Sequence, residues 1–415
     1  MKKTIFWVLI LAVSFLFVEL FPKNAEALPT FARKYKTACI TCHATFPRLT
    51  ALGEAVRLNG YKMPDGDELY IKDQPLSMGV SAYKKVFPEA VWPSDIPGMP
   101  PIAIRVIGDL EYDIGDDASD RDNDYRIEFP HEVEIFFAGS FGESMSFFGE
   151  IEFEEPSSPS TSFKAWLMWE DVIAENIFNI KAGNIGMQEI DLPNTRNHNR
   201  ITRSKYLTHE KITMPLAGPG LEVNGFGKVW RYATGIVKPQ GTFGDPAFYL
   251  TGSLKFGGLG YDGSGGTTEE GGLETTPSGY WRDDSVLLGG FYFKGDDYID
   301  RYGVDARFNV NDLSLAAGYL KEDHEASNLD ENILFAEAEY FVYPWLQPYV
   351  RYETLDADAV DSDEARVVIG TVLLARANVK INVEGKFYTE NDTQVAAGKD
   401  KNVDNRLYVR LDYAF

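Results

Sequence analysis

The feature that most constrains the fold of this 415-residue chain is an alternation of apolar and polar side chains that recurs after residue 101. In 248–256, for example, Phe, Leu, Gly, Leu and Phe occupy every second position, and more polar residues stand between them. Successive side chains of a β-strand point to opposite faces, so this period of two indicates strands with one apolar and one polar face. The same pattern occurs at 145–154, 304–310 and 379–387.

The length of these segments favours a membrane barrel. They are about ten residues long or slightly shorter, as is a tilted strand that crosses a membrane. Strands of a soluble β-sandwich, the alternative, are commonly about five or six residues long. The chain also ends in an amphipathic segment, 407–415, whose last residue is Phe415. That aromatic end resembles the insertion signal of Gram-negative outer-membrane barrels. The sequence contains some 15 to 17 candidate strands, and bacterial barrels typically have an even number of strands. It therefore predicts an all-β transmembrane barrel of about 16 antiparallel strands over residues 101–415.

The strand order predicts which connections share an end of the barrel. Short turns such as Asn311–Asp312 and Tyr343–Pro344 are expected on the periplasmic side. By alternation, the extracellular side then carries the acidic segments Asp113–Asp124, Lys321–Asn332 and Asp356–Glu364. Two longer segments, 257–284 and 188–219, are predicted to be loops with no side assigned.

The first 27 residues have the pattern of an export signal. Lys2 and Lys3 precede a largely apolar run, and Ala25-Glu26-Ala27 offers a small-x-small cleavage site. A transmembrane anchor is the alternative, but Glu19 ends the run short of the ~20 residues that a spanning helix needs. Residues 1–27 are therefore predicted to be a signal peptide.

The charge is large and unevenly distributed. The chain has 40 Lys and Arg against 63 Asp and Glu, a net charge of −23. Phosphate binding needs a basic face, so this balance argues against nucleic acid as a partner. Leu28–Arg48, however, contains four basic residues and no carboxylate. A basic N-terminal module followed by an acidic body is expected to dock on that body electrostatically.

The strongest chemical signal is Cys39-Ile40-Thr41-Cys42-His43. This C-x-x-C-H pentapeptide is the attachment signature of c-type haem. Two cysteines on one tight helical turn can each form a thioether to a haem vinyl group, and the following histidine can bind the iron as proximal ligand. A redox dithiol would not require His43, and a zinc site would need two more ligands. The motif uses both cysteines of the chain and agrees with export, so it predicts one covalently bound haem c.

The sixth iron ligand has several candidates. Methionine raises the haem potential and histidine lowers it, so the choice bears on function. Met63, 20 residues after His43 and followed by proline, is the preferred ligand. Met99 has a similar Met-Pro context, Met78 is a third candidate, and His131 would have to reach in from the body of the protein. A methionine in such a position is also compatible with simple packing.

The region around the motif is predicted to be small and helical. Arg48–Leu58 has one apolar side and a stop signal at Asn59–Gly60, which indicates a short helix. The stretch 28–63 is too short to bury a haem in a core of its own, so it should lean on a larger body. Seven prolines within 64–101 suggest a connecting segment. Residues 28–100 are therefore assigned to a small α-helical c-type cytochrome module with its linker, plugging or capping the barrel.

The order of these parts resembles the fused outer-membrane monohaem cytochrome–porins of iron-oxidising bacteria. The matching motifs are Leu28-Pro29-Thr30-Phe31-Ala32-Arg33, Phe46-Pro47-x-Leu49 and Leu58-Asn59-Gly60-Tyr61, and the barrel matches in architecture. Where this family commonly has asparagine and an aromatic residue in the helix after the motif, the chain has Thr50 and Leu52.

The resemblance implies a function and a place in the cell. The haem module would lie in the lumen or at the periplasmic side of a barrel in the Gram-negative outer membrane, surrounded by its lipid. It would accept electrons from extracellular Fe(II) and pass them to a periplasmic c-type cytochrome. Hard Fe(II) suits carboxylate ligands, and the alternation would point a set of glutamates inward as a candidate Fe(II) path: Glu132, Glu134, Glu150, Glu152 and Glu154. Porin interiors are polar in any case, so the same side chains also fit a plain polar lining.

Two other functions stay open. The haem could serve outward electron transfer to an external acceptor, or take electrons from another reduced metal or a partner cytochrome. Alternatively, the barrel is a diffusion porin whose haem is structural or regulatory, which predicts an open lumen. The sequence offers no Ser-His-Asp arrangement and no phosphate-binding glycine loop, so hydrolase and nucleotide chemistry are unsupported and no catalytic residues are assigned.

Overall fold

The structure is a computed structural model. It describes residues 30–64, 76–77, 95–96, 102–115, 125–141, 144–154, 160–186, 200–202, 204, 208–209, 212–213, 217–238, 246–265, 279–295, 299–324, 329–358 and 362–415. The predicted signal peptide and two of the candidate iron ligands, Met78 and Met99, lie outside these ranges. Within them, no helix is both long enough and apolar enough to cross a membrane.

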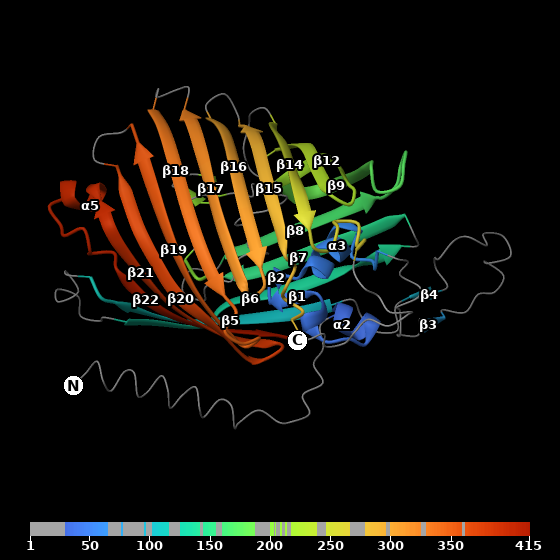
Figure 1. Ribbon diagram of the computed structural model, residues 1–415, viewed down its shortest axis with the longest axis horizontal. Helices are drawn as coiled ribbons and strands as arrows, with labels where there is room; N and C mark the ends of the chain where they lie inside the picture. Colours follow the sequence, from blue (N-terminus) through green and yellow to red (C-terminus); the bar gives the residue numbers. More distant parts are fainter. Residues whose placement is uncertain are drawn as a thin grey trace.

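Sixteen strands of the described chain form a closed barrel (Figure 1). All neighbouring strands are antiparallel, and the ring closes where the last strand, β22, pairs with the first, β5. The strands are β5 (Ile102–Asp113), β6 (Tyr125–Phe141), β7 (Met145–Glu154), β8 (Ser160–Trp169), β9 (Asn179–Gly186), β12 (Ala217–Phe226), β13 (Trp230–Val237), β14 (Ala247–Gly257), β15 (Ser285–Lys294), β16 (Ile299–Val310), β17 (Leu313–His324), β18 (Leu329–Tyr340), β19 (Leu346–Ala357), β20 (Glu364–Arg376), β21 (Val379–Asn391) and β22 (Arg406–Ala414). The predicted barrel and its strand number are confirmed.

The alternation in the sequence is the alternation between the outside and the lumen. On β14, Leu250 and Leu254 are 47% and 45% exposed, whereas Thr251 and Lys255 between and after them are 3% and 5% exposed. The apolar members of the pattern therefore form the outer wall, and the polar members are buried against the contents of the lumen.

Both ends of the barrel sequence lie at one mouth. Backbone hydrogen bonds of 2.7 and 2.8 Å join Ile104, near the start of β5, to the terminal Phe415. The turns at 311–312 and 343–344 lie at this same mouth because each joins a strand that runs toward it to one that runs away. The segment 257–284, which had no assigned side, joins β14 to β15 here as well, and the predicted acidic loops connect strands at the opposite mouth.

Several short elements accompany the barrel. Residues 30–64, which we call the plug, contain α2 (Thr30–Tyr35), the 3₁₀ turn η1 (Cys39–Thr41), the paired strands β1 (His43–Thr45) and β2 (Arg48–Leu49), and α3 (Ala51–Leu58). Two further hairpins pair β3 (Leu76–Ser77) with β4 (Asp95–Ile96) and β10 (Thr208–His209) with β11 (Ile212–Thr213), and α5 (Asp392–Ala396) lies between β21 and β22.

The helix after the motif begins later than predicted. Arg48 and Leu49 pair with β1 instead of starting the helix. The Thr50 side chain then caps α3 by accepting a hydrogen bond from the Gly53 amide, which fixes the start at Ala51. The predicted stop is correct, because Asn59 is the C-cap and Gly60 follows in the left-handed region at φ +63°.

The plug lies inside the mouth that holds both ends of the barrel sequence (Figure 1). Its side chains contact inward-facing residues from strands all around the ring, and these pairs are Phe46 with Arg105 on β5, Tyr61 with Trp166 on β8, Glu54 with Arg231 on β13, Arg48 with Glu339 on β18 and Thr45 with Gln347 on β19. Contacts on opposite sides of a ring place the plug within it. The barrel thus supplies the larger body on which the short N-terminal segment was expected to lean.

Candidate haem-attachment site

The C-x-x-C-H motif forms one tight turn within the plug. Cys39–Thr41 is a single 3₁₀ turn, and the Cys42 amide donates to the Cys39 carbonyl at 3.2 Å. In 3₁₀ geometry side chains three apart lie on the same side, so the two thiols share one face of the turn. Burial raises the pKa of Cys42 to about 12, and the adjacent Cys39 acts in the same direction. Burial also raises the pKa of Cys39, so both sulfurs are protonated thiols at neutral pH before any attachment.

The ring of His43 is oriented by a backbone carbonyl. Its Nδ1 lies 3.3 Å from the Pro47 carbonyl oxygen. A carbonyl can only accept, so Nδ1 carries the proton and the lone pair of the neutral ring is on Nε2. The Phe46 ring meets the imidazole edge-on, with centroids 5.1 Å apart at 60°. Burial lowers the pKa of His43 to about 4, so the imidazole is neutral and able to bind a metal at neutral pH.

This donor set fits a c-type haem. Two thiols on one face of a turn match two thioether bonds, and a histidine whose Nδ1–H is held by a carbonyl is the usual state of a metal-binding imidazole. The fit concerns the attachment residues only, and haem binding itself remains a prediction.

Helix α3 packs directly on the motif. The Thr50 amide donates to the Cys42 carbonyl at 2.9 Å, and the Thr50 hydroxyl donates to the Thr41 carbonyl at 3.0 Å. Gly53, one turn into the helix, is in contact with the same backbone, because a Cβ built there would lie 1.9 Å from the Cys42 oxygen. Thr50 and Gly53 together set the distance between the helix and the attachment turn.

We expect Gly53→Ala to lower the yield of covalent haem. The added methyl group overlaps the Cys42 carbonyl, so α3 or the motif must shift, and such overpacking typically costs about 1–3 kcal/mol. Haem per protein, measured from absorbance, checks this. Gly252→Ala is the matched control, because its new Cβ would only meet the Arg231 oxygen at 3.5 Å. Equal haem content in both variants would contradict the prediction.

Met63 lies in the small apolar core of the plug. It is 1% exposed and packs with Tyr35 and Val56, against which Phe31 and Leu52 also lie. It therefore shares the plug with His43, and its role as sixth ligand stays a prediction.

His131, the candidate from the barrel body, is engaged elsewhere in the lumen. Its Nδ1 is 2.7 Å from the Glu128 carboxylate, and its Nε2 is 3.6 Å from Asp109. These groups line a cavity of about 330 Å³, together with Thr202 and other polar residues. The structure thus places His131 within a polar network of β5 and β6.

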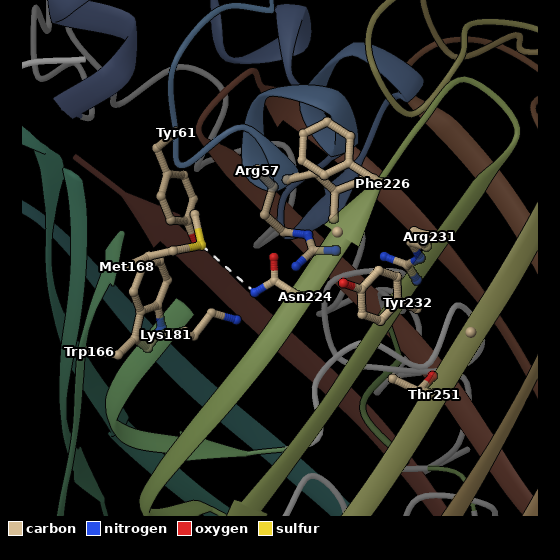
Figure 2. Close-up of a pocket in the computed structure, with 13 residues that line it drawn as sticks. Arg57, Tyr61, Trp166, Met168, Lys181, Asn224, Phe226, Arg231, Tyr232 and Thr251 are labelled. Carbon is tan, nitrogen blue, oxygen red and sulfur yellow. Dashed lines mark hydrogen bonds between the residues drawn. The ribbon is translucent and has the colours of Figure 1, made fainter. Parts of the chain in front are cut away.

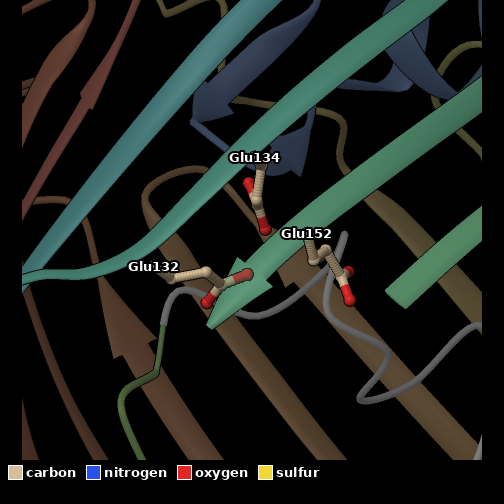
Figure 3. A group of neighbouring side chains, drawn as sticks. All are labelled: Glu132, Glu134 and Glu152. Atoms are coloured by element: carbon tan, nitrogen blue, oxygen red, sulfur yellow. The ribbon is translucent and has the colours of Figure 1, made fainter. Parts of the chain in front are cut away.

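Three of the five candidate glutamates come together (Figure 3). One carboxylate oxygen from each of Glu132, Glu134 and Glu152 lies within 4.8 Å of the others. The group is held by cations: Glu134 accepts two hydrogen bonds from Arg105, and Glu152 accepts one from Lys164 at 2.6 Å.

The other two glutamates lie apart from this group. Glu150 is paired with Lys164 at 3.4 Å, and Glu154 is exposed at the end of β7. The alternation of the sequence predicted the inward row, but it did not predict the cations that hold it.

A narrow cleft of about 30 Å³ lies between α3 and the wall of β8, β9, β12, β13 and β14 (Figure 2). Tyr61 lines it and stacks on Trp166 and Phe148 with centroids 6.1 and 5.6 Å apart. Arg57 and Arg231 also line it and share the Glu54 carboxylate at 2.7 Å each. The cleft therefore lies at the interface between the plug and the wall, which aromatic contacts and ion pairs cross.

A second segment also enters the lumen. Residues 200–202 and 204, from the long connection between β9 and β12, contact the inner wall. Arg200 binds Glu337 at 2.6 Å, and the Thr202 amide donates to Glu384 at 2.7 Å. Thr202 in turn accepts from Arg351 at 2.7 Å. Part of the loop predicted at 188–219 is thus pinned inside the barrel, which no local sequence signal indicated.

Comparison with known proteins identifies the fold. No protein-family model and no curated protein matches the sequence. Among solved structures, OmpF from Salmonella typhi, determined in complex with daunomycin, is similar with a TM-score of 0.50 at 13% identity, over 76% of this chain and 97% of that one. OmpTdeltaL8, a loop-deletion mutant of an outer membrane protein of Vibrio cholerae, is similar with a TM-score of 0.52 at 12% identity, over 76% and 99% of the two chains. The chain therefore has a porin-like barrel fold.

Proposed function

We propose that this chain is an outer-membrane electron-transfer protein of the cytochrome–porin type. It would carry one haem c on Cys39 and Cys42, take electrons from extracellular Fe(II) and pass them to a periplasmic c-type cytochrome. One observation carries the proposal: a C-x-x-C-H turn with a carbonyl-oriented histidine lies inside the mouth of a porin-like barrel. A redox centre in that position shortens the electron path across a bilayer core about 30 Å thick.

The outer wall and the barrel ends support the membrane placement. Exposed leucine, phenylalanine and valine side chains face outward along β14 to β19, as lipid-facing residues should. The mouth with short turns and both ends of the barrel sequence corresponds to the periplasmic side of such barrels. The plug then faces the periplasm, where a soluble electron acceptor can reach it.

Each part of the site has a distinct task. The two cysteines anchor the cofactor, His43 supplies the proximal nitrogen and Met63 is the proposed distal ligand. When bound, the haem would supply one-electron chemistry, so that Fe(II) would be oxidised to Fe(III) and the periplasmic cytochrome reduced by one electron. The inward carboxylates attract the divalent donor, and the net charge of −23 favours cation approach.

The diffusion-porin alternative is favoured by the fold of the structural neighbours. Against it stand the plug and residues 200–202 and 204, which both occupy the lumen. An open-pore conductance would distinguish the two functions.

The decisive experiment is stopped-flow mixing of the oxidised full-length protein with Fe(II), followed at the haem absorbance. We expect reduction in the wild type and none in His43→Ala. Lys36→Asn is the matched control, because this exposed plug residue has φ +48°, a conformation that asparagine tolerates. A wild-type haem that dithionite reduces but Fe(II) does not would refute iron oxidation and direct attention to other donors or outward transfer.

A further inference from the structure

The barrel wall holds the segment that orients His43. Lys380, on β21, donates from Nζ to the Phe46 carbonyl at 2.7 Å. The Arg105 guanidinium, on β5, lies 5.1 Å from the centroid of the Phe46 ring. That ring meets the imidazole of His43, and the next carbonyl, of Pro47, accepts from His43 Nδ1. Two cations of the barrel wall therefore contact Phe46, and Phe46 and Pro47 are the residues that orient His43.

These cations belong to a buried cluster of charged side chains. Asp412, on β22, binds Lys380 at 2.8 Å and Arg105 at 2.6 Å. Arg105 also binds Glu134, on β6, at 2.9 Å. Lys380, Asp412 and Glu134 are 4%, 2% and 5% exposed, so water screens their charges little. Lys380 and Arg105 thus contact the residue beside His43, and Asp412 and Glu134 are their acidic partners.

We propose that Lys380 and Arg105 are positioning residues for His43, and that their cluster with Asp412 and Glu134 sets the reduction potential of the iron bound there. This inference rests on the proposed haem attachment. Reduction adds one negative charge to the site, so a nearby positive charge favours the reduced state and a negative charge opposes it. Groups that hold a ligating histidine from behind also tune the metal through that ligand.

The cluster joins the haem site to the barrel rather than to the plug. Its four members come from β5, β6, β21 and β22, the strands on either side of the barrel closure. The plug alone therefore lacks the two wall cations that contact Phe46 beside its histidine. The native potential is expected only when the plug is seated in the closed barrel.

The test is the midpoint potential of two opposite charge variants in the full-length protein, measured by spectroelectrochemistry. Lys380→Met removes a positive charge and the hydrogen bond to Phe46, so the reduced state should become about tenfold less favoured. For one electron this lowers the midpoint potential by about 59 mV. Asp412→Asn removes a negative charge and should shift the potential upward. Lys380→Arg keeps the charge and a donor, so its potential should stay near the wild-type value.

The sign of the two shifts separates tuning from damage. A loosened structure would move both variants in the same direction or lower their haem content, and unchanged or same-direction potentials would overturn the inference. If Lys380→Met does not fold, Asp412→Asn and Lys380→Arg still decide it. An electrode measures the potential without Fe(II), so a haem protein that fails to oxidise Fe(II) refutes the proposed function while leaving this result readable. A wild type without covalent haem refutes both.

Discussion

Replacing Cys39 and Cys42 together with serine should remove all covalent haem from the protein. Thioether bonds need thiols, and the chain has no other cysteine to substitute. Haem staining of the protein on a denaturing gel measures the covalent link directly. We expect a strong signal from wild-type protein matured in a compartment that performs c-type haem attachment, and none from the double variant.

The barrel should persist in that variant. The strand ladders do not involve the two cysteines, which lie in η1 and its cap, so outer-membrane extraction and folded-barrel mobility should be unchanged. Thr41→Ser is the matched control, because Thr41 lies between the cysteines and its hydroxyl is 2.6 Å from that of Thr37. Serine keeps this contact and should keep the haem. A wild type without stain under the same conditions would contradict the assignment, and thiol alkylation would then show whether the pair cycles as a dithiol.

The barrel could be predicted from the sequence because its signal is local. Along β14 outward-facing leucines alternate with luminal threonine and lysine within a few residues, so the period of two indicated the strand and its two faces without any partner strand. The stop of α3 at Asn59–Gly60 was local in the same sense. Its start was not, because pairing of Arg48 with β1 overrode the helical pattern.

The support of the candidate site could not be predicted, since it depends on contacts that only barrel closure creates. Lys380 and Arg105 are separated by most of the barrel sequence, yet both reach Phe46. Neither lies in a motif, and each occupies an ordinary inward position of its strand. The insertion of Arg200 into the lumen is equally non-local, because its partner Glu337 lies more than a hundred residues away.

Reversing the charge of Lys62 should unseat the plug and open a conducting path. Lys62 is 8% exposed and forms an ion pair with Glu170, which is 6% exposed and lies at the end of β8. Breaking a buried pair on one side typically costs about 3–5 kcal/mol, which is about a hundredfold or more in the seating equilibrium. Lys62→Glu also places two carboxylates against each other. Single-channel recording in planar bilayers should show rare, low-conductance events in the wild type and frequent openings in this variant.

The matched control exchanges the two charges. Lys62→Glu combined with Glu170→Lys restores the opposite-charge pair in the same place, so the closed state should return. The openings of the single variant should still be smaller than those of an empty 16-strand barrel, because Arg200 and Thr202 hold the second luminal segment through Glu337 and Glu384, which the substitution does not touch. Equal, open conductance in the wild type and both variants would mean that the plug does not close the lumen. That result would favour the diffusion porin, in which the haem is structural or regulatory.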